Sequence, residues 1–197
     1  TRSPERFDEL RAAGADPLVF DGEEWSASLA ETLSLATCLV ASIAPGRSGD
    51  PAINTGRAAL VAAPRLQWSG YLSTVGVYGD RSGGWVDETS EPRPASKRSI
   101  DRLAAEIAWT ALAVARETPI ATLRLSGIFG PGRNALANLA EGTAKRVVKP
   151  GQVFNRIHVD DISRALAACM ASDQPGGVVN VCDDEPAPPQ DVITYAA

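Results

Sequence analysis

Two adjacent hydroxyl residues, Ser73 and Thr74, stand at the end of an apolar run, "LQWSGYLST" at 66–74, that is predicted to be a strand. Ligands of parallel α/β sheets bind beyond the carboxyl ends of the strands. A hydroxyl group at that place can hydrogen-bond the carbonyl or hydroxyl oxygen of a substrate. The same two side chains could instead satisfy local backbone groups, and the segment taken alone leaves both interpretations open.

A second group of candidates is basic and lies in the stretch "PRPASKRSIDRLAAE", a loop that runs into a predicted helix. The amino end of a helix carries roughly half a positive charge, so cations are unfavourable there. Lys97 can form an ion pair with Asp101, four residues on, and Arg102 lies in the second turn, where it can pair with Glu106. Arg98 is the basic residue at the start of this helix to which these pairs assign no partner.

Basic residues also gather further along the chain, at Lys145, Arg146, Lys149 and Arg156. A solvated face is one interpretation, and a site for the phosphates of a nucleotide-linked substrate is the other. The whole chain has a formal net charge of −5. Nucleic-acid binding requires a broad basic face, so we expect no nucleic-acid partner.

The sequence predicts neither a metal site nor a membrane span. His158 is the only histidine, and in "RIHVDDISRAL" we expect an Asp to cap a helix starting near residue 161 while His158 holds the loop. Three cysteines without a CxxC motif, Cys38, Cys169 and Cys182, are predicted to be buried thiols in a reducing compartment, which indicates a cytoplasmic protein. No apolar run approaches the ~20 residues that cross a bilayer.

Helical and strand-like segments alternate along the chain. Helices are predicted at 4–13, 25–35, 50–63, 96–117, 134–145, 160–171 and 188–197, and strands or extended segments at 17–21, 35–42, 66–74, 120–130, 152–159 and 177–183. The strands are continuously apolar. This pattern is typical of an α/β fold whose parallel sheet is covered on both faces.

One turn between a strand and a helix, "GPGRNA" at 130–135, formally matches the GxGxxA pattern of dinucleotide-binding loops. Pro131 removes an amide from the turn that should hold the phosphate, and no acidic residue follows roughly 20 positions on. We therefore expect a turn with a ligand-facing backbone, and not a phosphate-binding loop.

Taken in order, these motifs resemble the extended short-chain dehydrogenase/reductases, also called the NAD-dependent epimerase/dehydratase family. The matching segments are "YLSTVGVYGD", "VDET", "EPRP", "AAE", "LRLSGIFGPGR", "NRIHVDDISRAL" and "VVNVCDDEP". The resemblance covers nearly the whole chain and implies a doubly wound, Rossmann-type sheet with a small C-terminal substrate lobe. Residues 1–130 would form part of the dinucleotide-binding domain and 131–197 mainly the lobe, with a strand and helix near 152–171 returning to the first domain. By the same resemblance, the first strand and the glycine-rich turn would lie upstream of Thr1.

The resemblance implies that the chain binds NADP or NAD. Arg2 falls where such proteins often hold the 2′-phosphate of NADP, and Asp21 matches the acid that hydrogen-bonds the adenine. Two further sets of residues are implied to contact the adenine ribose and the nicotinamide, respectively: Ser42, Ile43 and Ala44, and Ser126, Gly127 and Ile128. NADP is favoured over NAD by Arg2 alone.

The resemblance also implies a catalytic centre with one large departure. Thr74 matches the catalytic Ser/Thr, with Ser73 beside it, but the usual Tyr and Lys are replaced by Arg98 and Arg102. Arginine cannot act as a base near neutral pH, because its pKa exceeds ~12. Both arginines are predicted to face the cofactor or an anionic substrate. Three further side chains are candidate substrate contacts: Tyr78, Arg133 and Arg156.

Two functions remain open. The first is an NAD(P)-dependent epimerase, dehydratase or oxidoreductase acting on a sugar nucleotide or a similar small molecule with a hydroxyl or carbonyl group. The second is a non-catalytic NAD(P)-binding redox sensor or regulator, which the missing tyrosine favours. A scaffold that has lost cofactor binding is a third reading, against which Arg2 and Asp21 argue. No oligomeric state follows from the sequence.

Overall fold

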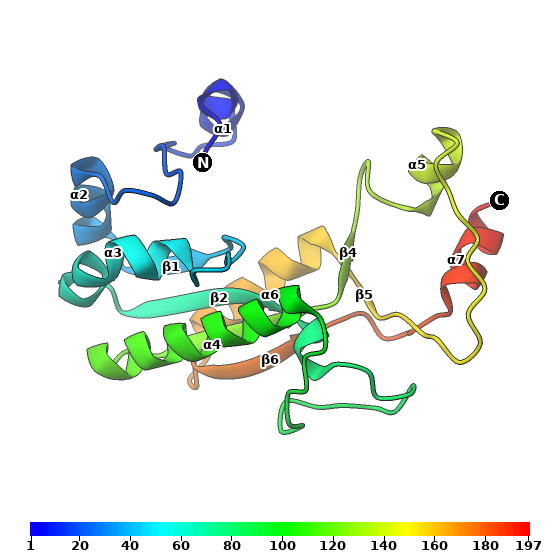
Figure 1. Cartoon of the computed structure of the whole chain (residues 1–197). Helices are drawn as coiled ribbons and strands as arrows, with labels where there is room; N and C mark the ends of the chain where they lie inside the picture. Colours follow the sequence, from blue (N-terminus) through cyan, green and yellow to red (C-terminus); the bar gives the residue numbers. More distant parts are fainter.

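The computed structural model describes all 197 residues of the chain (Figure 1). In chain order its elements are η1 (Pro4–Arg6), α1 (Phe7–Ala12), α2 (Ala27–Leu35), β1 (Cys38–Ala41), α3 (Pro51–Ala62), β2 (Trp68–Thr74), η2 (Val75–Tyr78), α4 (Lys97–Arg116), β3 (Ile120–Leu125), β4 (Gly127–Phe129), α5 (Ala135–Ala140), β5 (Arg156–His158), α6 (Val159–Ala171), β6 (Gly177–Val181) and α7 (Pro189–Ala196). None of these helices combines the length and the apolar character needed to cross a membrane.

Four strands form one parallel sheet in the order β1-β2-β3-β6. Thr74 at the end of β2 lies opposite Leu125 of β3, and Leu125 lies opposite Val181 of β6. The carboxyl ends of three strands therefore meet at one edge of the sheet, where a ligand of such a fold binds. The predicted α/β fold with a parallel sheet is confirmed.

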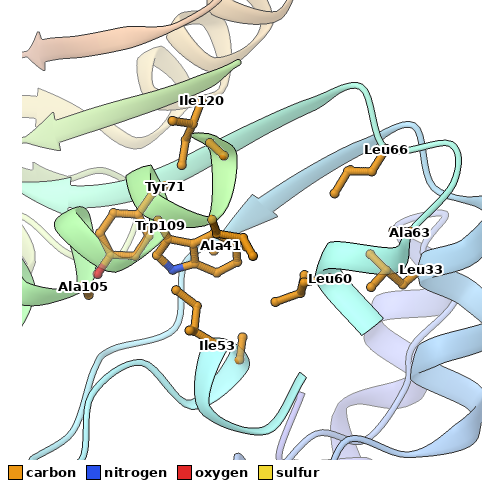
Figure 2. Close-up of a cluster of buried hydrophobic side chains, with 13 residues drawn as sticks. Leu33, Ala41, Ile53, Leu60, Ala63, Leu66, Tyr71, Ala105, Trp109 and Ile120 are labelled. Carbon is orange, nitrogen blue, oxygen red and sulfur yellow. The ribbon is translucent and has the colours of Figure 1, made fainter. Parts of the chain in front are cut away.

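Successive side chains of a strand point to opposite sides of the sheet. Helices cover both of these sides. On one face, α3 and α4 pack through a cluster that includes Leu60, Tyr71 and Trp109, all at most 1% exposed (Figure 2). On the other face, α6 packs against a second cluster around Leu123. Figure 1 shows α4 and α6 on opposite sides of the strands.

The start of α3 is fixed by a buried carboxylate. Asp50 is 2% exposed, and its Oδ1 accepts hydrogen bonds from the backbone N–H groups of Ala52 and Ile53 at 2.9 and 3.2 Å. Its Oδ2 accepts a hydrogen bond from Trp109 Nε1 at 3.0 Å, which ties α3 to α4. Gly56 fits inside α3 because the Trp25 ring lies against it, only 2.2 Å from where a Cβ would stand.

Several sequence expectations need correction. The segment 17–21 is not a strand: it shares only two backbone hydrogen bonds with Thr1, Phe20 N to Thr1 O and Thr1 N to Leu18 O, both 2.9 Å. The apolar run 120–130 is two strands, because the chain leaves the main sheet after Ser126 and β4 pairs with β5. The predicted helix 134–145 is shorter, ending at Ala140.

The cysteines are also less buried than expected. Cys38 and Cys182 are exposed, and Cys169 is partly buried. Cys38 lies on edge strand β1 and shares a face with Val40, which is 41% exposed, whereas Leu39 and Ala41 point to the opposite, α3-covered face. An apolar strand at the edge of a sheet therefore does not guarantee burial on both faces.

Arg116, the last residue of α4, is expected to hold the end of α3 in place. Its guanidinium donates hydrogen bonds to the backbone carbonyls of Leu60, Val61, Ala63 and Leu66. These carbonyls lie at the negative end of the α3 dipole and just beyond it. We expect Arg116→Ala to lower the free energy of unfolding by about 2 kcal/mol, measured by urea denaturation.

Arg11→Ala is the control for Arg116→Ala, because Arg11 forms an exposed ion pair with Asp8 and a contact with the Phe7 ring, both within its own helix. It should change the free energy of unfolding by less than about 1 kcal/mol. Equal stability of the two variants would contradict this role of Arg116.

Candidate functional site

Five residues predicted to contact a cofactor line one pocket of about 330 Å³. They come from three segments: the N-terminus, the segment before α2 and the turn after β1. They are Arg2, Asp21, Ser42, Ile43 and Ala44, and the pocket is completed by Thr1, Phe20, Gly22 and Pro51. The fold therefore brings together side chains that lie up to 42 positions apart in the sequence.

Asp21 brings negative charge to this pocket. Its Oδ1 accepts a hydrogen bond from the backbone N–H of Glu23 at 2.8 Å. This hydrogen bond holds the pKa of the Asp21 carboxyl below its usual value, so the group is ionised at neutral pH. The carboxylate is exposed and can accept a hydrogen bond from an amino group of a ligand.

Arg102 connects the pocket to the sheet edge. It is 9% exposed, and its Nη1 donates hydrogen bonds to Ile43 O at 3.3 Å, Tyr71 Oη at 3.2 Å and Leu72 O at 2.9 Å. The expected ion pair between Arg102 and Glu106 does not form, because both side chains turn toward the sheet and meet other partners there. The other predicted pair does form, with Lys97 Nζ 2.9 Å from Asp101 Oδ2.

Tyr71 is a tyrosine near the site that sequence reasoning did not single out. It is fully buried, and it stacks on Trp109 with 6.1 Å between ring centroids. Burial raises the pKa of Tyr71 to about 12, against the smaller opposing effect of Arg102. The phenol is therefore neutral at physiological pH and is not a substitute for the family's catalytic tyrosine. The sequence could have indicated Tyr71, because it stands two residues before Ser73 and therefore on the same face of β2.

Thr74 and Ser73 point to opposite faces of β2 and have different surroundings. Thr74 Oγ1 accepts a hydrogen bond from Gly76 N at 3.1 Å, and its own proton has no acceptor in the chain. Ser73 Oγ donates to the Glu106 carboxylate of α4. Glu106 in turn forms an ion pair with Arg124 of β3 at 2.8 Å. Of the two hydroxyls, only that of Thr74 keeps a free donor.

The buried ion pair continues into the loop beyond β2. The Arg124 guanidinium lies 4.8 Å from the centroid of the Tyr78 ring, and Tyr78 Oη donates to Asn180 Oδ1 at 2.8 Å. Glu88 Oε1, from the loop that follows, accepts the backbone N–H of Asn180 at 2.7 Å. Sequence reasoning missed this network, although an arginine inside the apolar run "IATLRLSG" was a visible signal. Tyr78 is 2% exposed, so a substrate contact through its hydroxyl would have to replace the bond to Asn180.

Ser126 follows β3 at the same edge of the sheet. It is 5% exposed, and its Oγ has no hydrogen-bond partner. A buried hydroxyl without a partner is costly unless a ligand or water satisfies it. Gly127 and Ile128 continue into β4, exposed and partly buried, respectively.

The remaining predicted arginines have different settings. Arg98 is exposed and makes no hydrogen bond or ion pair in this structure. Arg133 is exposed at the tight turn after β4, where it bridges to Gly130. Arg156 is committed to backbone, because its Nη1 donates to Phe154 O at 3.1 Å and to Ala187 O at 3.5 Å. It thereby joins the two segments that form the isolated bridge between Phe154 and Ala187.

The start of α6 differs from the expectation. His158 itself is the N-cap, since its Nδ1 accepts a hydrogen bond from Asp160 N at 3.3 Å, and the helix begins at Val159. No three His, Cys, Asp or Glu side chains of the chain lie together as a metal site would require.

Comparisons with known proteins support this reading of the fold. The model of the NAD dependent epimerase/dehydratase family matches residues 59–182. A conserved protein of unknown function from Silicibacter pomeroyi DSS is 47% identical, with a TM-score of 0.87 over 99% of this chain and 66% of that one. No curated protein gave a match.

Two more distant structures share the fold. One is a UDP-glucuronic acid 4-epimerase variant from Bacillus cereus in complex with UDP-4-deoxy-4-fluoro-glucuronic acid and NAD; it is 22% identical, with a TM-score of 0.68 over 87% of this chain and 62% of that one. The other is a dTDP-glucose 4,6-dehydratase from Bacillus anthracis in complex with NAD; it is 19% identical, with a TM-score of 0.73 over 96% and 67%. The chain thus spans about two thirds of the length of these proteins. From the family model and the Silicibacter pomeroyi relative, it follows that this chain belongs to the NAD-dependent epimerase/dehydratase family.

Proposed function

We propose that the protein binds NAD(P) and acts on the hydroxyl or carbonyl group of a sugar nucleotide or a similar small molecule. The observation that carries this proposal is the pocket that gathers Arg2, Asp21 and the turn at 42–44. Arg102 links its wall at Ile43 to the carbonyl of Leu72, two residues before Thr74 in β2. The unpartnered Ser126 hydroxyl at the same edge fits a bound polar group.

The residues have distinct roles in this proposal. The pocket holds the adenosine end of the cofactor, with Asp21 accepting a hydrogen bond from the adenine amino group. Ser126 and Ile128 flank the nicotinamide, which supplies the hydride transfer when bound. Thr74 donates a hydrogen bond to the substrate oxygen. Arg98 and Arg102 supply positive charge in place of the family's Tyr and Lys. Residues 1–130 act as the cofactor domain and 131–197 mainly as the substrate lobe, from which α6 and β6 return to the main sheet.

A sugar-nucleotide substrate is supported by the distant relative from Bacillus cereus, which was solved with a UDP-sugar and NAD. The exposed basic residues of the lobe, Arg133 and Arg146, are suited to the diphosphate of such a ligand. The contacts of these two arginines with the diphosphate would lie beyond the main sheet, near the paired strands β4 and β5.

The second candidate is a non-catalytic NAD(P)-binding sensor or regulator. It is favoured by the absence of an available proton-exchanging tyrosine. Arg98 stands at that position, the pKa of Tyr71 is raised to about 12 by burial, and the Tyr78 hydroxyl is already bonded to Asn180. A sensor needs the cofactor pocket but not a proton donor.

Cofactor binding by the full-length protein tests both candidates, and NADPH fluorescence is the measurement. We expect binding of NADPH, and we expect Arg2→Ala to weaken NADPH binding about 10- to 100-fold, the loss of a hydrogen bond between charged groups. NADH binding should change little, because NADH lacks the 2′-phosphate. Arg47→Ala is the control, since Arg47 is an exposed arginine that does not line the pocket.

The outcomes separate the candidates. Absence of NADPH and NADH binding would overturn both. Turnover with a panel of UDP-sugars and small carbonyl compounds would support the enzyme, whereas tight binding without turnover would favour the sensor. Equal loss of NADPH and NADH affinity in Arg2→Ala would contradict the specific role of Arg2.

A further inference from the structure

Gly76 stands between two hydroxyl groups from different elements. A Cβ built on Gly76 would lie 3.1 Å from Ser99 Oγ and 3.4 Å from Thr74 Oγ1. Thr74 ends β2, Gly76 lies in η2 and Ser99 lies in the first turn of α4. Both hydroxyls therefore lie within contact distance of the position that a side chain on residue 76 would occupy.

The Thr74 hydroxyl is oriented by the backbone. Its oxygen accepts the Gly76 N–H at 3.1 Å, which occupies one lone pair. The hydroxyl proton has no acceptor in the chain and can turn toward a ligand atom that rests against Gly76. A donor held in this way is available to a ligand oxygen.

The Ser99 hydroxyl, like that of Thr74, accepts a hydrogen bond from the chain and keeps a free proton. Ser96 caps α4 by accepting the Ser99 N–H at 3.1 Å, and the Ser96 hydroxyl donates to Ser99 Oγ at 2.9 Å. Ser99 Oγ is therefore an acceptor toward Ser96, and its own proton has no acceptor in the chain. Because Ser96 provides the cap, the helix does not require the Ser99 hydroxyl.

We propose that Ser99 is a second hydrogen-bond donor to the substrate oxygen that Thr74 binds, and that the absence of a side chain at Gly76 lets this oxygen approach both hydroxyls. The inference rests on the proposed function. A carbonyl oxygen has two lone pairs and can accept from both hydroxyls at once. Donors fixed before the reaction stabilise negative charge as it develops on that oxygen. Ser99 keeps its proton throughout, so its role is polarisation of the substrate.

The position of Ser99 explains how the site can work with Arg98 where the family has tyrosine. Arg98 immediately precedes Ser99 in the first turn of α4, and its exposed guanidinium has no partner. The first turn of α4 thus offers the neutral Ser99 hydroxyl and the positive charge of Arg98 in place of the tyrosine phenol. Neither group exchanges a proton near neutral pH, so this turn binds and polarises the substrate oxygen.

Steady-state kinetics of Ser99→Ala test the proposal, on a UDP-sugar or carbonyl compound that the wild type turns over. We expect kcat to fall about 10- to 100-fold, with KM and the NADPH dissociation constant changing less than about threefold, because the lost donor acts on the reacting oxygen. Ser99→Thr retains a hydroxyl and should recover most of kcat. Gly76→Ala should reduce kcat in the same direction, since its methyl group would stand 3.1 Å from Ser99 Oγ and crowd that hydroxyl. Ser163→Ala, at an exposed serine of α6, is the matched control.

Each outcome decides between this inference and the proposed function. Wild-type kcat in Ser99→Ala overturns the role of Ser99 and leaves the proposed function intact. Failure of the wild type to bind either NADPH or NADH overturns the proposed function and this inference with it. If the wild type binds NADPH without turnover, the readout is the affinity for UDP-glucuronic acid in the presence of NADP. A loss of fivefold or more in Ser99→Ala, on the order of one neutral hydrogen bond, then supports the second donor, and an unchanged affinity overturns it.

Discussion

Thr74→Ala is expected to lower kcat of the full-length protein about 10²- to 10³-fold, the cost of removing a principal preoriented donor to a developing oxyanion. Thr74 is the residue at the end of β2 whose hydroxyl proton is free, whereas the Ser73 hydroxyl is committed to Glu106. NADPH affinity should stay within about threefold of wild type, because Thr74 does not line the pocket that contains Arg2 and Asp21. The measurements are steady-state kinetics on a compound that the wild type turns over and NADPH fluorescence titration.

Thr74→Ser is the control, because it keeps the hydroxyl and removes only a methyl group. We expect it to retain most of kcat. A Thr74→Ala variant with wild-type kcat would show that this hydroxyl is not the one that meets the substrate. A variant that loses kcat and NADPH affinity together would instead indicate a structural role for the turn after β2.

Glu106→Ala is expected to lower the free energy of unfolding by about 3–5 kcal/mol, the largest stability effect we predict. Glu106 and Arg124 form an ion pair at 2.8 Å with side chains only 6% and 5% exposed. Removing the carboxylate leaves the Arg124 charge buried without its partner and removes the acceptor of the Ser73 hydroxyl. Urea denaturation monitored by circular dichroism gives the difference.

Two further variants show whether the cost comes from the unpaired charge. Asp101→Ala breaks the exposed pair with Lys97 on the same helix and should cost less than about 1 kcal/mol. The double variant Glu106→Leu with Arg124→Met removes both charges and should be markedly more stable than Glu106→Ala. A Glu106→Ala variant as stable as Asp101→Ala would contradict the prediction.

The sequence predicts the sheet and most helices because each element shows its own pattern. The 20 residues of α4 match the segment predicted as 96–117 to within a residue at each end, since Ser96 supplies a cap and the apolar residues recur with helical spacing. The run at 17–21 is predicted to be a strand because it too shows a local pattern, a short apolar segment. It fails to be one because strand formation depends on a partner, and in this structure it meets only Thr1.

Site residues show the same difference between local and long-range information. Thr74 and Arg102 could be found from motif order, but the partners of Arg102 come from the turn after β1 and from β2, 59 and 30 residues away. The Glu106–Arg124 pair joins a helix to a strand, so no spacing rule along α4 reveals it. A serine in the first turn of a helix is usually explained by capping, so the sequence alone does not distinguish Ser99. Its relation to Gly76 is visible only once η2 and α4 are packed together.

The bond from Glu88 to the backbone of Asn180 has a consequence for the behaviour of the protein at high concentration. β6 is an edge strand, and an unpaired backbone N–H on such an edge is a template for strands of other molecules. The Glu88 carboxylate occupies that N–H at 2.7 Å and places a negative charge along the edge. The loop after β2 thereby shields the sheet from intermolecular strand pairing, and any movement that opens this loop also uncovers a surface prone to aggregation.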